Sequence, residues 1–149
     1  MNTILTWLQC RLGVALVAVT LFAAGEAAGR SDGATDEIVG TWRGSSACVD
    51  RVAAPACNDE QVVYEISATP GKANTVTVKA DKVVEGKRVP MGAHDLTRDA
   101  KDGGWMVEFE TPRVHAIWRL TVSGPTMQGN MTLLPSKAVV RRMDLRKDE

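Results

Sequence analysis

The chain has 149 residues, of which 44% are apolar and 24% are charged, and its 18 Lys and Arg residues equal its 18 Asp and Glu residues. These values are ordinary for one globular domain and exclude a disordered or fibrous chain. The balanced charge argues against nucleic acid or an anionic membrane as the main partner, because both favour a concentrated basic surface.

The N-terminal residues 1–27 have the pattern of a secretory signal peptide. Arg11 precedes an apolar run over residues 12–24, and small side chains follow it. We expect cleavage after Ala27, and Gly25 offers a nearly equivalent position. An uncleaved anchor is the alternative, but a span needs about 20 apolar residues and would bury Arg11. We therefore expect a periplasmic or secreted protein with no membrane span after cleavage.

The next segment, residues 28–37, is small and polar and predicts a flexible N-terminal arm before a barrel domain over residues 38–147. Cys48 and Cys57 are the two thiols that remain once the leader has gone. An even pair in an exported chain favours a structural disulfide. The eight residues between the two cysteines fit neither a redox Cys-x-x-Cys pair nor a zinc-ligand spacing.

Apolar and polar residues alternate with period two in short runs that turn residues separate. The expected strands cover residues 38–44, 61–69, 75–84, 89–96, 105–110, 116–122, 127–133 and 138–145. No amphipathic helix is expected. Eight short strands with short connections predict an all-β, antiparallel, up-and-down barrel, because closing the sheet removes its exposed edges.

The first and last of these expected strands carry a recognisable pattern. Gly40-Thr41-Trp42 begins the first strand, with the indole expected at the barrel floor, and the last strand contains Arg141 and Arg142. A Gly-x-Trp in the first strand and an arginine in the last strand resemble the lipocalin-like, or calycin, barrels, in particular the compact exported bacterial ones. The resemblance implies a structural role for Trp42, an arginine packed over it from position 142 or 141, and small apolar ligands.

Arg141 is the main candidate for binding. Strand alternation places its side chain inward together with Met143, and a buried guanidinium needs a partner. That partner is either a ligand carboxylate, with Tyr64 donating a second hydrogen bond as in related barrels that hold fatty acids, or the ring of Trp42. Large inward aromatic residues leave a narrow pocket or none. The expected ligand-binding residues are Arg141, Tyr64, Trp118 and Met131.

Catalysis has little support, since the sequence contains no nucleophile-elbow motif and both histidines, His94 and His115, are expected on the outer face. No cofactor is expected. One alternative is that His94, Asp95 and His115 meet at a zinc or copper ion. Another concerns inward thioethers, which either fill the core or select cuprous copper; these belong to Met91, Met127, Met131 and Met143.

The sequence therefore predicts an exported, non-catalytic, lipocalin-like binding module for a small apolar or amphipathic ligand. The first alternative is a protein that binds and inhibits an exported enzyme through either the arm at residues 28–37 or the disulfide loop at residues 48–57. The second alternative is a periplasmic metal-handling protein.

Overall fold

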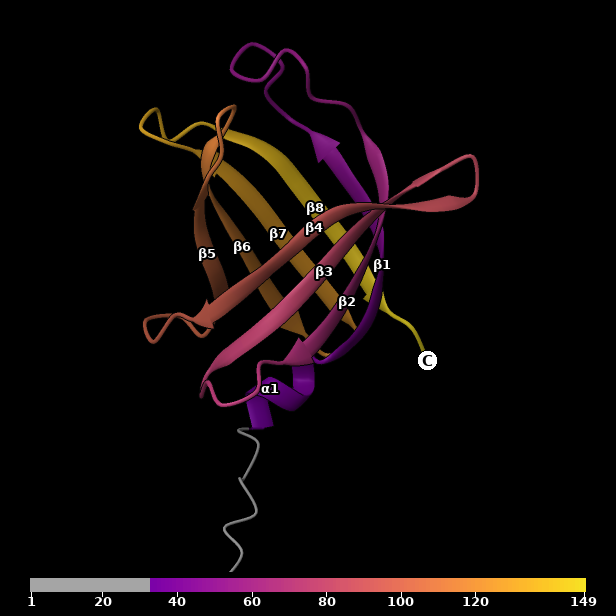
Figure 1. Cartoon of the computed structure of the whole chain (residues 1–149), viewed down its shortest axis with the longest axis vertical. Helices are drawn as coiled ribbons and strands as arrows, with labels where there is room; N and C mark the ends of the chain where they lie inside the picture. Colours follow the sequence, from indigo (N-terminus) through magenta and orange to yellow (C-terminus); the bar gives the residue numbers. More distant parts are fainter. Residues whose placement is uncertain (1–32) are drawn as a thin grey trace, which may run out of the picture.

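Eight strands close into one barrel in the computed structural model, which describes residues 33–149 (Figure 1). Each strand pairs antiparallel with the next, and the last pairs with the first. The predicted eight-stranded, antiparallel, up-and-down barrel is therefore confirmed. The elements are α1 (Gly33–Ile38), β1 (Gly40–Cys48), β2 (Glu60–Ala68), β3 (Thr75–Val84), β4 (Lys87–Arg98), β5 (Trp105–Glu110), β6 (His115–Ser123), β7 (Thr126–Leu133) and β8 (Val139–Lys147).

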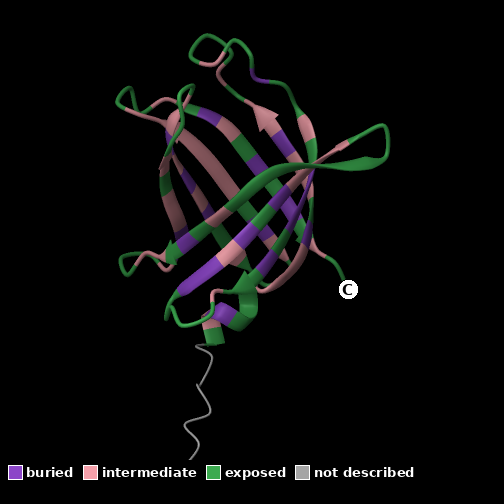
Figure 2. Ribbon diagram, in the orientation of Figure 1, coloured by how far each residue is buried: buried purple, intermediate pink, exposed green. Residues whose placement is uncertain are grey.

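Alternation along the strands produces the core. Val78, Leu96 and Leu120 have no exposed surface, and they come from β3, β4 and β6. Buried and exposed residues follow one another along most strands in Figure 2. Burying one such side chain contributes about 1.5–3 kcal/mol, so the inward rows supply most of the driving force for closure.

The floor of the barrel differs from the expectation. Residues 33–38 form the short helix α1, where an arm up to residue 37 and a strand from Ile38 were predicted. Ile38 is fully buried, and its carbonyl oxygen accepts a hydrogen bond of 2.8 Å from Nε1 of Trp42. Nζ of Lys147 donates to the carbonyl of Glu37 at 2.8 Å. A helix of six residues is too short to show a helical period in the sequence, so only these tertiary contacts reveal it.

The predicted signal peptide, its cleavage site and residues 28–32 of the predicted arm lie outside the described residues. Within residues 33–149, no helix has the length and hydropathy needed to cross a bilayer.

The residue opposite Trp42 is neither of the two arginines. The register of β1 and β8 pairs Trp42 with Lys147, whose Nζ lies 5.4 Å from the ring centroid. Arg141 pairs with Cys48, six positions earlier on β8, which is about 20 Å along a strand. Arg142 is exposed. The expectation that Arg141 or Arg142 packs on Trp42 is therefore wrong, because β8 continues beyond its apolar run.

A bulge in β4 reverses the expected alternation of that strand. Ala80 pairs with Gly92 and Asp81 pairs with Pro90, so Met91 is the extra residue. Gly92 has a φ of +135°, a conformation that glycine adopts far more readily than other residues. Beyond the bulge, His94 lies opposite the buried Val78 and therefore points into the barrel.

The seam between β4 and β5 is the least paired part of the wall. These strands share two register pairs, Thr97 with Met106 and Arg98 with Trp105. By contrast, β5 and β6 share six pairs. In Figure 1 the two strands diverge from their paired ends, and Figure 2 shows most of β4 as exposed.

Candidate ligand-binding site

A cavity of about 280 Å³ lies inside the barrel at the end that carries the disulfide loop, opposite α1. All four residues predicted to bind a ligand line it: Tyr64 from β2, Trp118 from β6, Met131 from β7 and Arg141 from β8. The barrel thus brings together side chains that are far apart in the sequence. The remaining lining residues are Ser46, Glu60, Ala80, Met91, Gly92, His94, Phe109 and Met143.

Aromatic rings form much of the wall. The rings of Tyr64 and Trp118 meet edge to face, with centroids 5.2 Å apart and an interplanar angle of 75°. His94 lies 4.9 Å from Phe109 and 6.0 Å from Trp118, centroid to centroid. The prediction that His94 faces outward is therefore wrong, because the bulge at Met91 shifts its parity.

Two polar groups of residues that line the cavity have no protein partner within residues 33–149. Trp118 is 4% exposed, and its Nε1 is the one buried side-chain nitrogen or oxygen without a hydrogen bond among the residues described. The hydroxyl of Tyr64 makes no hydrogen bond within residues 33–149 either. Burial raises the pKa of Tyr64 well above its ordinary value, with Arg141 acting in the opposite direction. The phenol therefore stays protonated and can donate.

Arg141 points inward, as predicted, but it is already paired. Its Nη1 lies 3.1 Å from Oε2 of Glu60 and donates to Oγ of Ser46 at 2.8 Å, while Nη2 donates to the carbonyl of Asn58 at 3.1 Å. The side chains of Arg141 and Glu60 are 17% and 19% exposed. Glu60 therefore takes the position in which a ligand carboxylate was considered.

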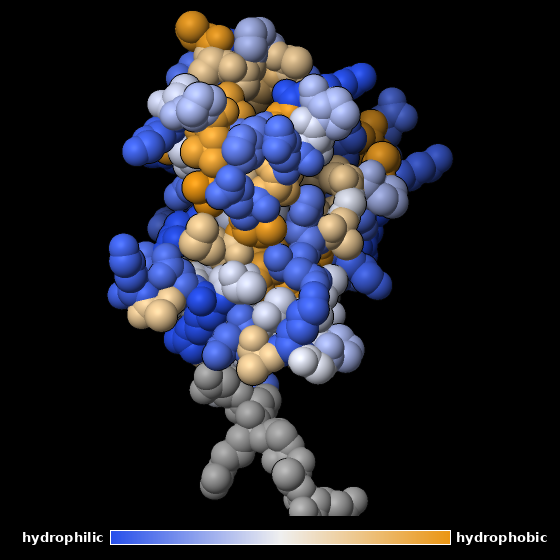
Figure 3. All heavy atoms as spheres, turned by 60° about the vertical axis from the view of Figure 1, so that its left-hand side comes forward, coloured by the Kyte–Doolittle hydropathy of each residue, from blue (hydrophilic) through white to orange (hydrophobic). Residues whose placement is uncertain are grey.

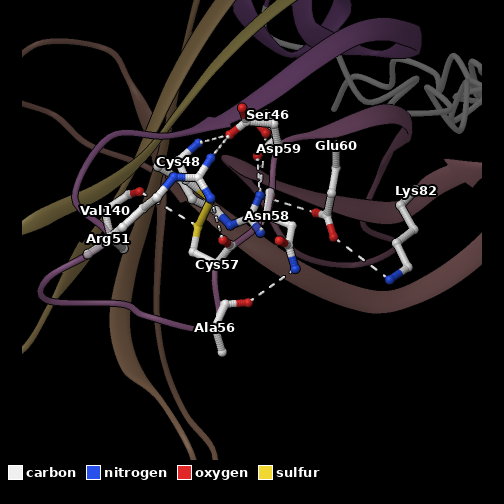
Figure 4. Close-up of polar contacts among 11 residues, drawn as sticks. Ser46, Cys48, Arg51, Ala56, Cys57, Asn58, Asp59, Glu60, Lys82 and Val140 are labelled. Atoms are coloured by element: carbon white, nitrogen blue, oxygen red, sulfur yellow. Dashed lines mark hydrogen bonds and ion pairs between the residues drawn. A yellow bond between two sulfur atoms is a disulfide. The ribbon is translucent and has the colours of Figure 1, made fainter.

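Glu60 also lies near a second cation, since Nζ of Lys82 is 3.8 Å from its Oε1 (Figure 4). Sequence reasoning missed Glu60 because it precedes the strand expected at residues 61–69, whereas β2 begins at Glu60. The signal that could have found it is parity, because Glu60 lies two and four positions before the inward Val62 and Tyr64.

The predicted disulfide between Cys48 and Cys57 is formed, with Cα atoms 5.9 Å apart. It lies next to Arg141, because Cys48 is the register partner of Arg141 and Cys57 directly precedes Asn58. Arg51 braces the loop by donating to the carbonyl of Cys57 at 3.1 Å (Figure 4). The crosslink thus holds the segment whose carbonyl binds the guanidinium, and such bonds persist in oxidising compartments.

The three residues considered for a metal ion do not converge. His94 faces the cavity, whereas Asp95 binds Lys72 at 2.8 Å and His115 contacts Glu108 at 2.7 Å, both on the outer face. In the described part of the chain, no group of three or more His, Cys, Asp or Glu residues could hold a metal ion.

The methionines divide between two regions. Met91, Met131 and Met143 line the cavity, whereas Met127 is buried in the core without lining it. We interpret the three thioethers as an adaptable apolar lining, because methionine fills irregular space well.

No protein-family model matches the sequence, and no curated protein matches it. Among solved structures, the siderocalin Ex-FABP is similar at a TM-score of 0.48 and 11% identity, over 76% of this chain and 74% of that one. A mutant of the fluorescent protein UnaG is similar at a TM-score of 0.43 and 12% identity, over 76% of this chain and 98% of that one. The closed, eight-stranded antiparallel barrel itself follows from the strand order and register of this chain.

Proposed function

We propose that this protein is an exported, non-catalytic binding module that holds a small apolar or amphipathic molecule inside its barrel. The observation that carries the proposal is the cavity of about 280 Å³ in which Tyr64, Trp118, Met131 and Arg141 meet. A wall of aromatic rings and thioethers with a few polar groups is the usual composition of a small-molecule site. We assign no catalytic step, because the charged groups at the cavity, Arg141 and Glu60, are paired with each other.

Two adjacent alanines allow a direct test. Ala80 lines the cavity and is 6% exposed, whereas Ala93 is exposed and pairs with Lys79 on the outer face. The neutral fluorescent probe 1-aminoanthracene should bind the wild-type protein and Ala93→Phe, but not Ala80→Phe, whose added ring fills the cavity. Circular dichroism checks that each variant is folded, because overpacking costs about 1–3 kcal/mol. Failure of the wild type to bind the probe, with no small molecule retained in native mass spectrometry, contradicts the proposal.

Export is the second part of the proposal. It is supported by the signal-like pattern of residues 1–27 and by the Cys48–Cys57 disulfide, which favours a periplasmic or extracellular location. Cell fractionation followed by N-terminal sequencing should find the mature chain outside the cytoplasm, beginning after Ala27 or Gly25. A cytoplasmic protein with its first 27 residues intact contradicts this part.

One observation bears on the alternative of a protein-binding inhibitor. Val52, at the disulfide loop, is 93% exposed, and Val49 is 47% exposed. The end of the predicted arm forms part of α1 at the opposite end of the barrel (Figure 1), so the loop and the arm are two separate candidate docking segments. In Figure 3 hydrophobic residues also reach the surface at other places in the upper half of the molecule. The loop carries the more exposed of these valines, and Val52→Ser should abolish capture of any partner that uses the loop.

A further inference from the structure

Tyr64 carries a polar group for which the protein supplies no partner. The residue is 3% exposed, and its ring faces the cavity from β2. Its hydroxyl makes no hydrogen bond within residues 33–149. Nε1 of Trp118 is the one unpaired side-chain nitrogen or oxygen in this range that is sealed from water, so the unpaired hydroxyl of Tyr64 keeps some accessible surface. Because the ring points inward, that surface faces the cavity.

The other polar groups at the cavity leave this hydroxyl as the buried donor that a bound molecule can use. Ser46, Glu60 and Arg141 are joined to one another by a hydrogen bond and an ion pair. Nε1 of Trp118 is out of reach of any molecule in the cavity. The ring of His94 packs against two aromatic rings, and this residue is only half-buried, so water reaches it. A ligand atom that pairs with the hydroxyl therefore gains affinity from it.

The guanidinium of Arg141 is not free to hold a ligand anion. Glu60 lies 3.1 Å from it, and the guanidinium also donates to Ser46 and Asn58. A second cation, Lys82, lies 3.8 Å from the carboxylate of Glu60 and is 38% exposed, so solvent screens it. A ligand carboxylate would have to displace Glu60 or lie close to its negative charge, and both are unfavourable.

Burial opposes a negative charge at the hydroxyl of Tyr64. The loss of hydration raises the pKa of this phenol well above its ordinary value, although Arg141 acts in the opposite direction. A ligand carboxylate at the same place would meet the same balance between lost hydration and the field of the guanidinium. An uncharged oxygen costs far less to bury than a carboxylate, so it is the better partner for this hydroxyl.

The walls suit an apolar body around that oxygen. The ring of Tyr64 meets the ring of Trp118 edge to face at 5.2 Å, and three thioethers complete the lining. These belong to Met91, Met131 and Met143, and methionine side chains adapt to irregular shapes. The cavity is partly open to solvent, so a ligand can extend beyond it and the cavity does not fix the length of the ligand.

We propose that the cavity selects uncharged, largely apolar molecules with an alcohol or carbonyl oxygen, and that the hydroxyl of Tyr64 donates a hydrogen bond to this oxygen. The inference rests on the proposed function and names its ligand class. It departs from the carboxylate considered for Arg141, because the guanidinium stays with Glu60 and a neutral phenol makes the polar contact.

Three naphthalenes that share one ring system test this inference on the mature chain by equilibrium dialysis. In 2-acetylnaphthalene the substituent is a neutral ketone, in 2-naphthoate it is a carboxylate of similar size, and in 2-ethylnaphthalene it has no acceptor. We expect 2-naphthoate to bind at least tenfold more weakly than the ketone, because its charge must be buried beside Glu60.

Tyr64→Phe removes the hydroxyl and keeps the ring. It should weaken 2-acetylnaphthalene about fivefold, the value of one neutral hydrogen bond, and leave 2-ethylnaphthalene within about twofold. The matched control is Thr121→Val, which removes an exposed hydroxyl from a residue of β6 that does not line the cavity. It should leave the affinities of all three probes within about twofold.

Infrared spectroscopy adds a readout that is specific to the hydrogen bond. The carbonyl stretch of bound 2-acetylnaphthalene should lie at lower frequency in the wild type than in Tyr64→Phe, because a hydrogen bond to the oxygen weakens the C=O bond. Thr121→Val should reproduce the wild-type frequency. Tyr64 is the only tyrosine of the chain, so no second phenol can take over the contact.

The outcomes separate the inference from the proposed function. If Tyr64→Phe changes neither the affinity nor the carbonyl frequency of 2-acetylnaphthalene, while 2-ethylnaphthalene binds, the inference is wrong and the proposed function stands. Equal weakening of the ketone and 2-ethylnaphthalene means that only packing has changed, which also overturns the inference. Binding of 2-naphthoate as tight as that of the ketone overturns the assignment of an uncharged ligand. If none of the three probes nor 1-aminoanthracene binds the wild type, the proposed function fails together with the inference.

Discussion

Replacing Glu60 by glutamine tests the ion pair between Glu60 and Arg141, whose opposite charges neutralise each other at the cavity. Removing one partner of a fully buried pair costs about 3–5 kcal/mol, whereas exposed pairs contribute about 0–1 kcal/mol. Arg141 and Glu60 are 17% and 19% exposed, so the pair lies between these limits, nearer the buried one. Because Arg141 keeps Ser46 and Asn58 as acceptors, we expect Glu60→Gln to lower the free energy of unfolding by about 2 kcal/mol.

The assay is urea unfolding at pH 7 with circular dichroism, and Glu65→Gln is the matched control. Glu65 lies 2.8 Å from Arg88, but these side chains are 47% and 37% exposed and Arg88 also binds Asp81. The control should therefore lose less than about 0.5 kcal/mol. The slope of the unfolding free energy against urea should not change, because neither substitution alters the surface exposed on unfolding.

A third variant completes the cycle. Glu60→Gln combined with Arg141→Met removes both charges, and it should regain most of the loss, because the uncompensated guanidinium is what destabilises Glu60→Gln. In Glu60→Gln itself, 2-naphthoate should bind at least tenfold more tightly than in wild type, since Arg141 then lacks its carboxylate. A loss no greater than that of Glu65→Gln, together with unchanged 2-naphthoate affinity, refutes the reasoning.

Three further predictions concern the disulfide, one glycine and Tyr64. Replacing Cys48 and Cys57 by alanine should lower the free energy of unfolding, measured in urea, by about 2–3 kcal/mol. If the double variant is as stable as the wild type, the crosslink does not constrain the unfolded chain. Gly44→Ala should cost about 3 kcal/mol or more, because an added Cβ meets the carbonyl of Asp144 on the neighbouring strand; a thermal midpoint equal to wild type contradicts this. Burial raises the pKa of Tyr64 above its ordinary value of 10.0. Above that pH the unfolded chain releases a proton that the folded barrel keeps, so the unfolding free energy should fall by up to about 1.4 kcal/mol per pH unit. Urea titrations between pH 9 and 11 should show a steeper fall in wild type than in Tyr64→Phe, and parallel slopes would exclude this cause.

The strands were predictable because each buries one face, so apolar and polar residues alternate along the sequence with a period of two. The prediction for residues 75–84 coincides with β3, and that for residues 105–110 coincides with β5. The residue that packs on Trp42 was not predictable in the same way, because its identity depends on the register between β8 and β1. That register places Lys147, and neither arginine, opposite Trp42. The alternation of apolar and polar residues identifies a strand, whereas the closure of the barrel determines which residues of neighbouring strands lie opposite each other.

The candidate site was predictable only in part, for two physical reasons. The alternation of side chains correctly predicted that Tyr64 and Arg141 both face the barrel interior. The single extra residue at Met91, however, turns the side chain of His94 from the outer face to the inner face. Bulges have a weak local signature, and here the signal was Gly92 in the middle of a strand pattern. The partner of Arg141 was missed because Glu60 lies 81 positions away in the chain and meets it only through β1.

The sparse seam between β4 and β5 also determines where the barrel exchanges with solvent. With two register pairs there and six between β5 and β6, the amides of residues 92–96 and 107–110 that point toward this seam have no cross-strand register partner, whereas those that point the other way face β3 or β6. Amide hydrogen exchange should therefore be fastest along this seam, through local opening that leaves the other seven seams paired. Since Met91, His94 and Phe109 line the cavity from these two strands, such a local opening would also give a molecule a route through the wall while the rest of the barrel stays paired.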